Sequence, residues 1–113
     1  MAPDKEKDYT KISQSQLDNI IKLHKKFLEG DTGGARCVLK FKDLSGLSMS
    51  GKDLTGADFT GCLMNGVDLS EGIFETASFF VCDLRRANLE KGKFARADFR
   101  GAYVLGANLT GAD

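Results

Sequence analysis

From Cys37 onward the chain repeats a five-residue pattern without any insertion. In all fifteen complete repeats the third residue is apolar, from Leu39 to Leu109, and the first is usually small. The second residue is often Asp or Asn, and eight repeats end in Gly. A period of five fits neither the 3.6 residues of an α-helical turn nor the two-residue alternation of a long strand. The pattern therefore predicts a chain that changes direction once in every repeat.

A square coil with four repeats per turn satisfies this pattern. The first and third residues of a repeat share one side, as in a short strand, and a corner then turns the next pair inward again. Asp or Asn in the second position favours such corners because its side chain can bond nearby backbone groups, and a final Gly relieves steric strain. Residues twenty apart should then stack in four columns, which we number from the repeats that begin at Cys37, Lys42, Leu47 and Lys52.

The large side chains fit these columns. The phenylalanines in third positions fall only into columns one and four: Phe59, Phe79 and Phe99, and Phe74 and Phe94. In column four the first residue of the same repeat is Gly72 or Gly92, which leaves room for the ring. Such pairing of large with small residues is what a closely packed core requires.

Four repeats carry the pattern in its fullest form: AlaAspPheThrGly (57–61), AlaAsnLeuGluLys (87–91), AlaAspPheArgGly (97–101) and AlaAsnLeuThrGly (107–111). They resemble the A(D/N)Lxx motif of the pentapeptide-repeat family, and the resemblance covers residues 37–113. It implies an all-β solenoid, a right-handed quadrilateral parallel β-helix. Seventy-five residues in complete repeats give 75/20, or just under four turns, roughly 18 Å tall at about 4.8 Å per turn.

The residues before the repeats predict a different structure. Residues 1–12 are charged and lack an apolar period, so we expect a disordered arm. Residues 13–36 are predicted to form a capping helix and a glycine-rich linker, with Ser15 and Asp18 as a capping box and Gly30 as the terminator. One stripe of this helix should pack on the coil: Leu17, Ile20, Ile21, His24, Phe27 and Leu28. Lys42 and Lys52 stand at inward positions and predict an irregular first turn.

The sequence shows no pattern typical of catalysis. His24 is the only histidine and has no recognisable catalytic or metal-binding partners, so we expect it to pack in the core. Cys62 and Cys82 share a column one turn apart, near enough for a disulfide, but burial as small apolar residues is the preferred interpretation. We therefore expect no enzyme activity, cofactor or metal. Three cysteines without close pairs and balanced charge, sixteen bases against sixteen acids, favour a protein of the reducing cytoplasm without membrane or nucleic-acid partners.

Outward positions distinguish the faces of the coil. Face three is entirely polar or Gly, whereas faces one and two carry apolar residues at outward positions: Phe41, Leu63, Phe80, Val81, Tyr103 and Leu105. Three arginines border them, Arg85, Arg86 and Arg100. This mixture is typical of protein interfaces, and it predicts a non-catalytic interaction scaffold or an assembly or targeting module. The alternative is a set of isolated surface residues, with Phe41 tucked under the cap.

A second functional hypothesis comes from the resemblance alone. Some family members imitate duplex DNA and bind type II topoisomerases such as DNA gyrase, which requires a continuous acidic face. The acidic residues here are dispersed over all four faces, so this is the alternative hypothesis. At the other end, Leu109 and Ala112 are predicted to leave an exposed apolar coil. A continuation of the chain, a partner or a second copy would cover it.

Overall fold

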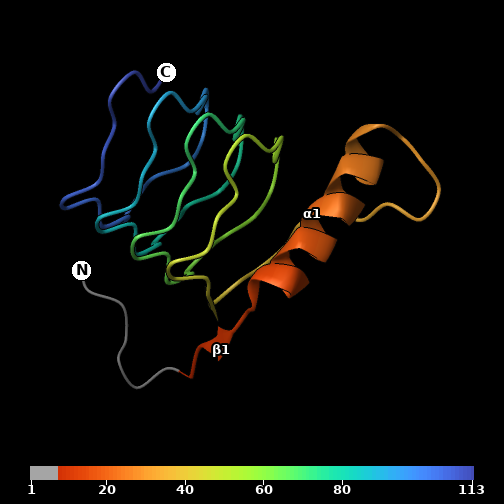
Figure 1. The fold of residues 1–113 in the computed structure, drawn as a ribbon, viewed down its shortest axis with the longest axis horizontal. Helices are drawn as coiled ribbons and strands as arrows, with labels where there is room; N and C mark the ends of the chain where they lie inside the picture. The colour runs from red at the N-terminus through yellow and green to blue at the C-terminus, as the bar shows by residue number, and fades with distance from the viewer. Residues whose placement is uncertain (1–7) are drawn as a thin grey trace.

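The computed structural model describes residues 8–113. Residues 37–113 wind into a coil of stacked turns (Figure 1). Parallel bridges join residues twenty apart all along it, from Val38↔Asp58 to Asn88↔Asn108. The N–H of Leu39 donates to the carbonyl of Asp58 at 2.7 Å, the N–H of Asp58 donates to the carbonyl of Cys37 at 2.9 Å, and the same pattern continues along the coil. The predicted solenoid and its twenty-residue register are confirmed.

Each corner is made by two devices that recur with the repeat. The fifth residue has a positive φ in all fifteen repeats, and seven of these residues are not glycine. In ten repeats the side chain of the second residue accepts a hydrogen bond from the N–H two residues later, as Asp58 does from Thr60 at 2.9 Å. This confirms the expected role of Asp and Asn at the corners.

The core is formed by the inward columns. Phe59, Phe79 and Phe99 stack in column one, with ring centroids 5.4 and 4.9 Å apart. Phe74 and Phe94 stack in column four at 5.4 Å. A Cβ placed on Gly92 would lie 2.5 Å from the Phe94 ring. The predicted pairing of a glycine in the first position with a phenylalanine in the third is therefore confirmed.

The helix α1 spans Gln14–Leu28 and begins two residues earlier than the sequence suggested. Its N-cap is Ser13, whose hydroxyl accepts from the N–H of Gln16 at 3.1 Å, while the N–H of Ser13 donates to the Gln16 side chain at 2.8 Å. The predicted capping box of Ser15 and Asp18 is therefore wrong. Gly30, with φ of 75°, ends the helix as expected, and its N–H donates to the carbonyl of Phe27.

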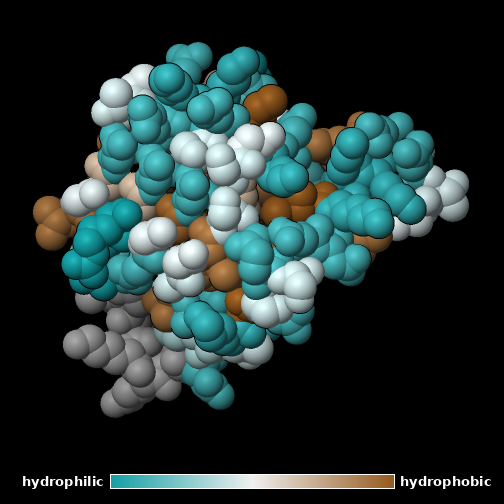
Figure 2. Space-filling view, in the orientation of Figure 1, coloured by the Kyte–Doolittle hydropathy of each residue, from teal (hydrophilic) through white to brown (hydrophobic). Residues whose placement is uncertain are grey.

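The helix does not bury its whole predicted stripe. Leu17, Ile21 and His24 are buried against the first coil, and Ile20 is partly buried. Phe27 and Leu28 are 45% and 38% exposed, because they lie in the last turn, where the helix extends beyond the coil (Figure 1). Apolar side chains are visible where α1 meets the coil (Figure 2).

The segment before the helix is part of the fold. Strand β1, Thr10–Lys11, pairs in parallel with β2, Lys42–Asp43, and Ile12 is buried. The predicted disordered arm is therefore wrong for these residues, and its first part, 1–7, lies outside the described residues. Lys42 belongs to this pair and Lys52 is exposed; neither side chain enters the core.

The first coil would otherwise present unpaired backbone groups. In column two, β1 pairs with it, and the N–H of Ile12 donates to the carbonyl of Asp43 at 3.0 Å. In column three, the side-chain amide of Gln14 accepts from the N–H of Ser48 at 2.8 Å and donates to its carbonyl at 2.9 Å. This amide bonds Ser48 as the peptide group of a preceding coil would.

Candidate functional site

The predicted surface on faces one and two contains two clusters of the same design. On face one, Arg100 lies over the ring of Phe80, with its guanidinium carbon 5.4 Å from the ring centroid. Nε and Nη2 of Arg100 donate to the two carboxylate oxygens of Asp98 at 2.9 and 2.8 Å. These hydrogen bonds lower the pKa of Asp98 to about 2 and fix the plane of the guanidinium over the ring.

On face two, Arg85 lies over Tyr103 at 5.7 Å and donates to both carboxylate oxygens of Asp83 at 2.8 and 2.6 Å. Asp83 is only 1% exposed, and its carboxylate also accepts from Asn65 at 3.0 Å. Burial by itself raises the pKa of Asp83, but the hydrogen bonds from Arg85 and Asn65 outweigh burial and hold it below its ordinary value. The sequence did not single out Asp83 or Asn65, because the repeat places a carboxylate at most corners.

The edge between the two faces carries the other apolar residues. Val81 is 39% exposed at this corner, and its Cγ1 is 2.8 Å from where a Cβ on Gly101 would lie. Phe41 lies two coils earlier on the same corner, with its ring against Gly61. It is 36% exposed, so it is not tucked beneath the helix.

Leu63 and Tyr103 stand on either side of Asp83 in the ladder of face two. Both occupy the second position of their repeats, where ten other repeats place a residue that bonds the corner backbone. Leu105, close to Tyr103, is 79% exposed, and Arg86 at the next corner is exposed as well. We call the whole set the arginine–aromatic patch: Phe41, Leu63, Phe80, Val81, Arg85, Arg86, Arg100, Tyr103 and Leu105.

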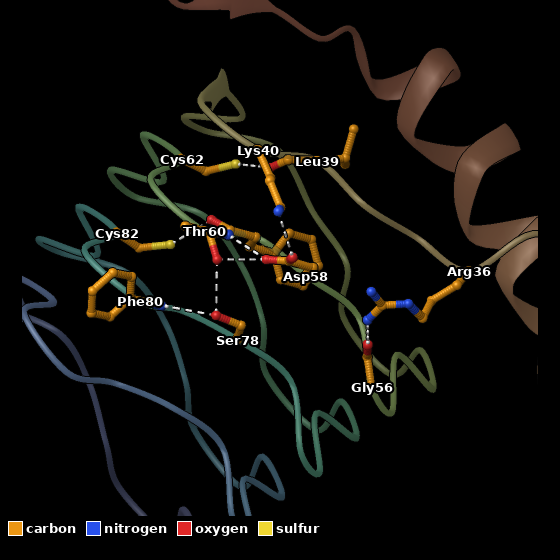
Figure 3. A network of polar contacts seen from close by, with 11 residues as sticks. Arg36, Leu39, Lys40, Gly56, Asp58, Thr60, Cys62, Ser78, Phe80 and Cys82 are labelled. Atoms are coloured by element: carbon orange, nitrogen blue, oxygen red, sulfur yellow. Dashed lines mark hydrogen bonds and ion pairs between the residues drawn. The ribbon is translucent and has the colours of Figure 1, made fainter.

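The cysteine thiols are enclosed. Cys62 donates to the carbonyl of Leu39, and Cys82 donates to that of Phe59 at 2.8 Å (Figure 3). Burial raises the pKa of Cys37 and Cys62 to about 12, and it raises that of Cys82 as well. All three thiols are free, so Cys62 and Cys82 form no disulfide here.

A groove of about 600 Å³ lies between α1 and the first coil, and no pattern in the sequence predicted it. Its charges balance, because three acids and three bases line it: Asp18, Glu29 and Asp53, and Lys22, Lys25 and Lys52. Among residues 8–113, no group of three or more His, Cys, Asp or Glu side chains is placed to hold a metal ion. Within the same residues, no helix is both long and apolar enough to cross a membrane.

The last coil is more open than the first. Leu109 is 53% exposed, Val104 is 43% exposed, and Ala112 is partly buried. The N–H groups of Phe99, Val104 and Leu109 donate to no backbone carbonyl of the described residues. In the coil before, the N–H groups at the same positions donate to carbonyls of the following coil, as Phe79 does to Asp98 at 2.8 Å.

The comparisons with known proteins agree with this geometry. A crystal structure of a pentapeptide repeat protein from the thylakoid lumen of Arabidopsis thaliana is similar, with a TM-score of 0.63 and 29% identity over 73% of this chain and 59% of that one. Pentapeptide repeat proteins from Nostoc PCC 7120 and Cyanothece 51142 share the fold, with TM-scores of 0.74 and 0.52 and identities of 17% and 20%. They align with 94% and 67% of this chain, and with 78% and 60% of their own.

No curated protein sequence matched the chain. The sequence profile described as pentapeptide repeats matches residues 37–75 and 77–113, in eight copies. The matched segments cover most of the chain and coincide with the coil. The chain therefore belongs to the pentapeptide repeat family.

Proposed function

We propose that this chain is a non-catalytic protein-interaction module, and that the arginine–aromatic patch is the surface that binds its partner. The observation that carries the proposal is the pair of arginines fixed over aromatic rings, Arg100 over Phe80 and Arg85 over Tyr103. Aromatic residues and arginine are enriched among the residues that dominate binding energy at protein interfaces. Because the carboxylates of Asp83 and Asp98 already orient the two guanidiniums, little side-chain entropy remains to be lost on binding.

A second observation also supports the proposal: two residues of the patch lack a hydrogen bond that most repeats make at the same position. At positions 63 and 103 an Asp or Asn would accept a hydrogen bond from the corner backbone, as Asn88 does from Glu90 at 3.0 Å. Leu63 and Tyr103 give up that bond, which contributes about 1 kcal/mol in a typical protein. A function that needs apolar side chains on face two accounts for this loss.

The alternative, imitation of duplex DNA for a type II topoisomerase, is supported less well. It requires a row of acidic side chains free to replace phosphates. On faces one and two, Asp58 pairs with Lys40 at 3.7 Å, and Asp83 and Asp98 pair with Arg85 and Arg100. These pairs neutralise three of the four aspartates on the two faces that carry the patch.

Two further elements fit an interaction module. We propose that α1 and β1 act as a cap, because they cover the backbone edge of the first coil that would otherwise invite strand addition. The last coil is a second candidate contact, to be covered by following chain, by a partner or by a second copy. Three free, buried cysteines suit a reducing compartment, and on that ground we propose the cytoplasm.

The test replaces two patch residues by the side chain that the repeat prefers. The double variant Leu63→Asn, Tyr103→Asn is expected to keep or slightly raise the free energy of unfolding, because each Asn restores a corner hydrogen bond. It should nevertheless lose the protein that the wild-type chain captures from an extract of its source cells, measured by quantitative mass spectrometry. Ile73→Asn on face four makes the same replacement away from the patch and should capture the partner normally.

Capture of the same protein by the double variant would show that the patch is not the binding surface. Inhibition of DNA supercoiling by the purified chain at low micromolar concentration would instead favour the alternative function. The unfolding measurements exclude a trivial explanation, since a variant that is at least as stable as the wild type cannot lose binding through misfolding.

A further inference from the structure

His24 connects three segments of the chain in the interior. Its side chain is 0% exposed. The ring lies between the N–H of Cys37, 2.9 Å from Nδ1, and the carbonyl of Thr55, 2.9 Å from Nε2. A backbone N–H can only donate and a carbonyl can only accept, so Nδ1 carries no proton and Nε2 carries one. The helix is thus joined through one neutral tautomer to the first and the fourth repeat of the first coil.

We propose that His24 makes the cap acid-sensitive: protonation of its ring releases α1 from the first coil. A proton on Nδ1 turns the acceptor into a donor that faces the N–H of Cys37, so this hydrogen bond is lost. The added charge would also be buried without a counter-ion, which is strongly unfavourable. Both costs disappear when the helix moves away and the imidazolium reaches water.

The surroundings of the ring offer no compensation. On the linker, Arg36 is cationic and donates to the carbonyl of Gly56 at 2.7 Å. At the start of the coil, the Cys37 thiol is neutral because burial raises its pKa to about 12. On the coil, the carboxylate of Asp53 accepts from the N–H and hydroxyl of Thr55 at 3.1 and 2.7 Å. On α1 the neighbouring charge is Lys25, and within residues 8–113 no carboxylate bonds the imidazole.

Release of the helix would uncover defined groups. The carbonyl of Thr55 would lose its donor, and Ser48 would lose the amide of Gln14 that bonds both its N–H and its carbonyl. Cys37, 1% exposed at the start of the coil, would become accessible. Cys62 and Cys82 lie inside later coils and would remain enclosed.

The coil should survive the same change in pH. An imidazole in water takes up its proton near pH 6.5. The pKa of Asp98 is lowered to about 2 by its hydrogen bonds with Arg100. For Asp58 and Asp83, burial raises the pKa, but hydrogen bonds outweigh it and hold the pKa below 3.8. These carboxylates remain ionised at pH 5, so the corners of the coil are retained at that pH.

The experiment follows the three thiols separately. The full chain is treated with dithiodipyridine at pH 7 and at pH 5, and modified cysteines are quantified by peptide mass spectrometry. Each rate is divided by that of the unfolded chain at the same pH, which removes the intrinsic pH dependence of the reagent. We expect the normalised rate of Cys37 to rise roughly tenfold or more at pH 5, since one bound proton changes the opening equilibrium by up to about tenfold per pH unit. Cys62 and Cys82 should stay unreactive.

Two controls make the result decisive. His24→Gln retains one donor and one acceptor but cannot titrate, so its Cys37 rate should be the same at both pH values. Amide hydrogen exchange of the wild-type chain provides a second measurement. After correction for intrinsic rates, exchange should be faster at pH 5 in residues 14–28 and at the uncovered N–H groups of Cys37 and Ser48, and unchanged in the later coils, residues 57–113. An unchanged Cys37 rate in the wild type, an equal rise in all three cysteines, or uniform exchange in helix and coil would each overturn the proposal.

Discussion

At the scale of single residues, the corner of each repeat controls the backbone. All fifteen fifth-position residues have a positive φ, yet only eight are glycine. A left-handed conformation costs a residue with a Cβ about 1 kcal/mol or more, and β-branched residues suffer most. Thr76 and Val81, with φ of 59° and 51°, are therefore strained positions that the rest of the coil holds in place.

Thr76 offers a direct test because its side chain is exposed and lies outside the patch. We expect Thr76→Gly to raise the free energy of unfolding by about 1 kcal/mol, measured by urea denaturation, because the strain at the corner is removed. Gly66→Ala is the matched opposite: a Cβ there meets nothing within 4 Å, so strain alone should lower stability by a similar amount. Equal and opposite changes in the free energy of unfolding would show that backbone strain at the fifth position causes both effects. Destabilisation by both substitutions would contradict this explanation.

The buried acid Asp83 shows why residue type alone does not identify the site. Its position in the repeat is that of any corner Asp, and its sequence neighbours give no sign of burial. Only the fold brings Asn65 from the preceding coil to its carboxylate, 3.0 Å away. The stacking of coils therefore creates one buried, arginine-paired carboxylate at a position that elsewhere in the chain stays partly exposed.

At the scale of elements, the start of α1 was decided by contacts distant in sequence. Ser15 followed by Asp18 has the spacing of a capping box, and so does Ser13 followed by Gln16. The structure selects Ser13 because β1 pairs with β2 immediately before it and Gln14 binds Ser48 on the first coil. These two anchors place residue 14 in the first turn of the helix, so Ser15 is already helical.

A pair of alanine substitutions tests this assignment. Ser13→Ala should lower the free energy of unfolding by about 1 kcal/mol, since the N–H of Gln16 loses the hydroxyl that accepts its hydrogen bond. Ser15→Ala should have little effect or stabilise the helix slightly, because alanine is the better helix former. Thermal denaturation followed by circular dichroism distinguishes the two, and a larger loss for Ser15→Ala would restore the sequence-based capping box.

At the scale of the whole molecule, the aromatic columns make the coil cooperative. Phe79 lies near four other rings, with centroids between 4.9 and 6.0 Å away, from three successive coils. Phe99 is at the open end and only partly buried. In a solenoid each coil is stabilised mainly by its neighbours, so the loss of an inner ring should weaken several coils at once.

We therefore expect Phe79→Ala to cost about 3–5 kcal/mol and Phe99→Ala clearly less. Urea unfolding of both variants measures the difference, and hydrogen exchange should show that Phe99→Ala affects mainly the last coil. Similar losses at the two positions would mean that the last coil is packed as tightly as the interior, contrary to its exposure.

The sequence by itself determined the coil, its twenty-residue register, the aromatic columns, the corner residues and the end of the helix at Gly30. Each of these follows from a repeat or a local backbone preference that recurs over a few residues. Only the tertiary structure decided how the first edge is closed by β1, Gln14 and His24, how Asp83 is buried, and which arginines lie over which rings. These contacts join residues that are 13 or more positions apart in the chain. No local pattern operates over such separations, and only the packing of coils and helix brings the residues together.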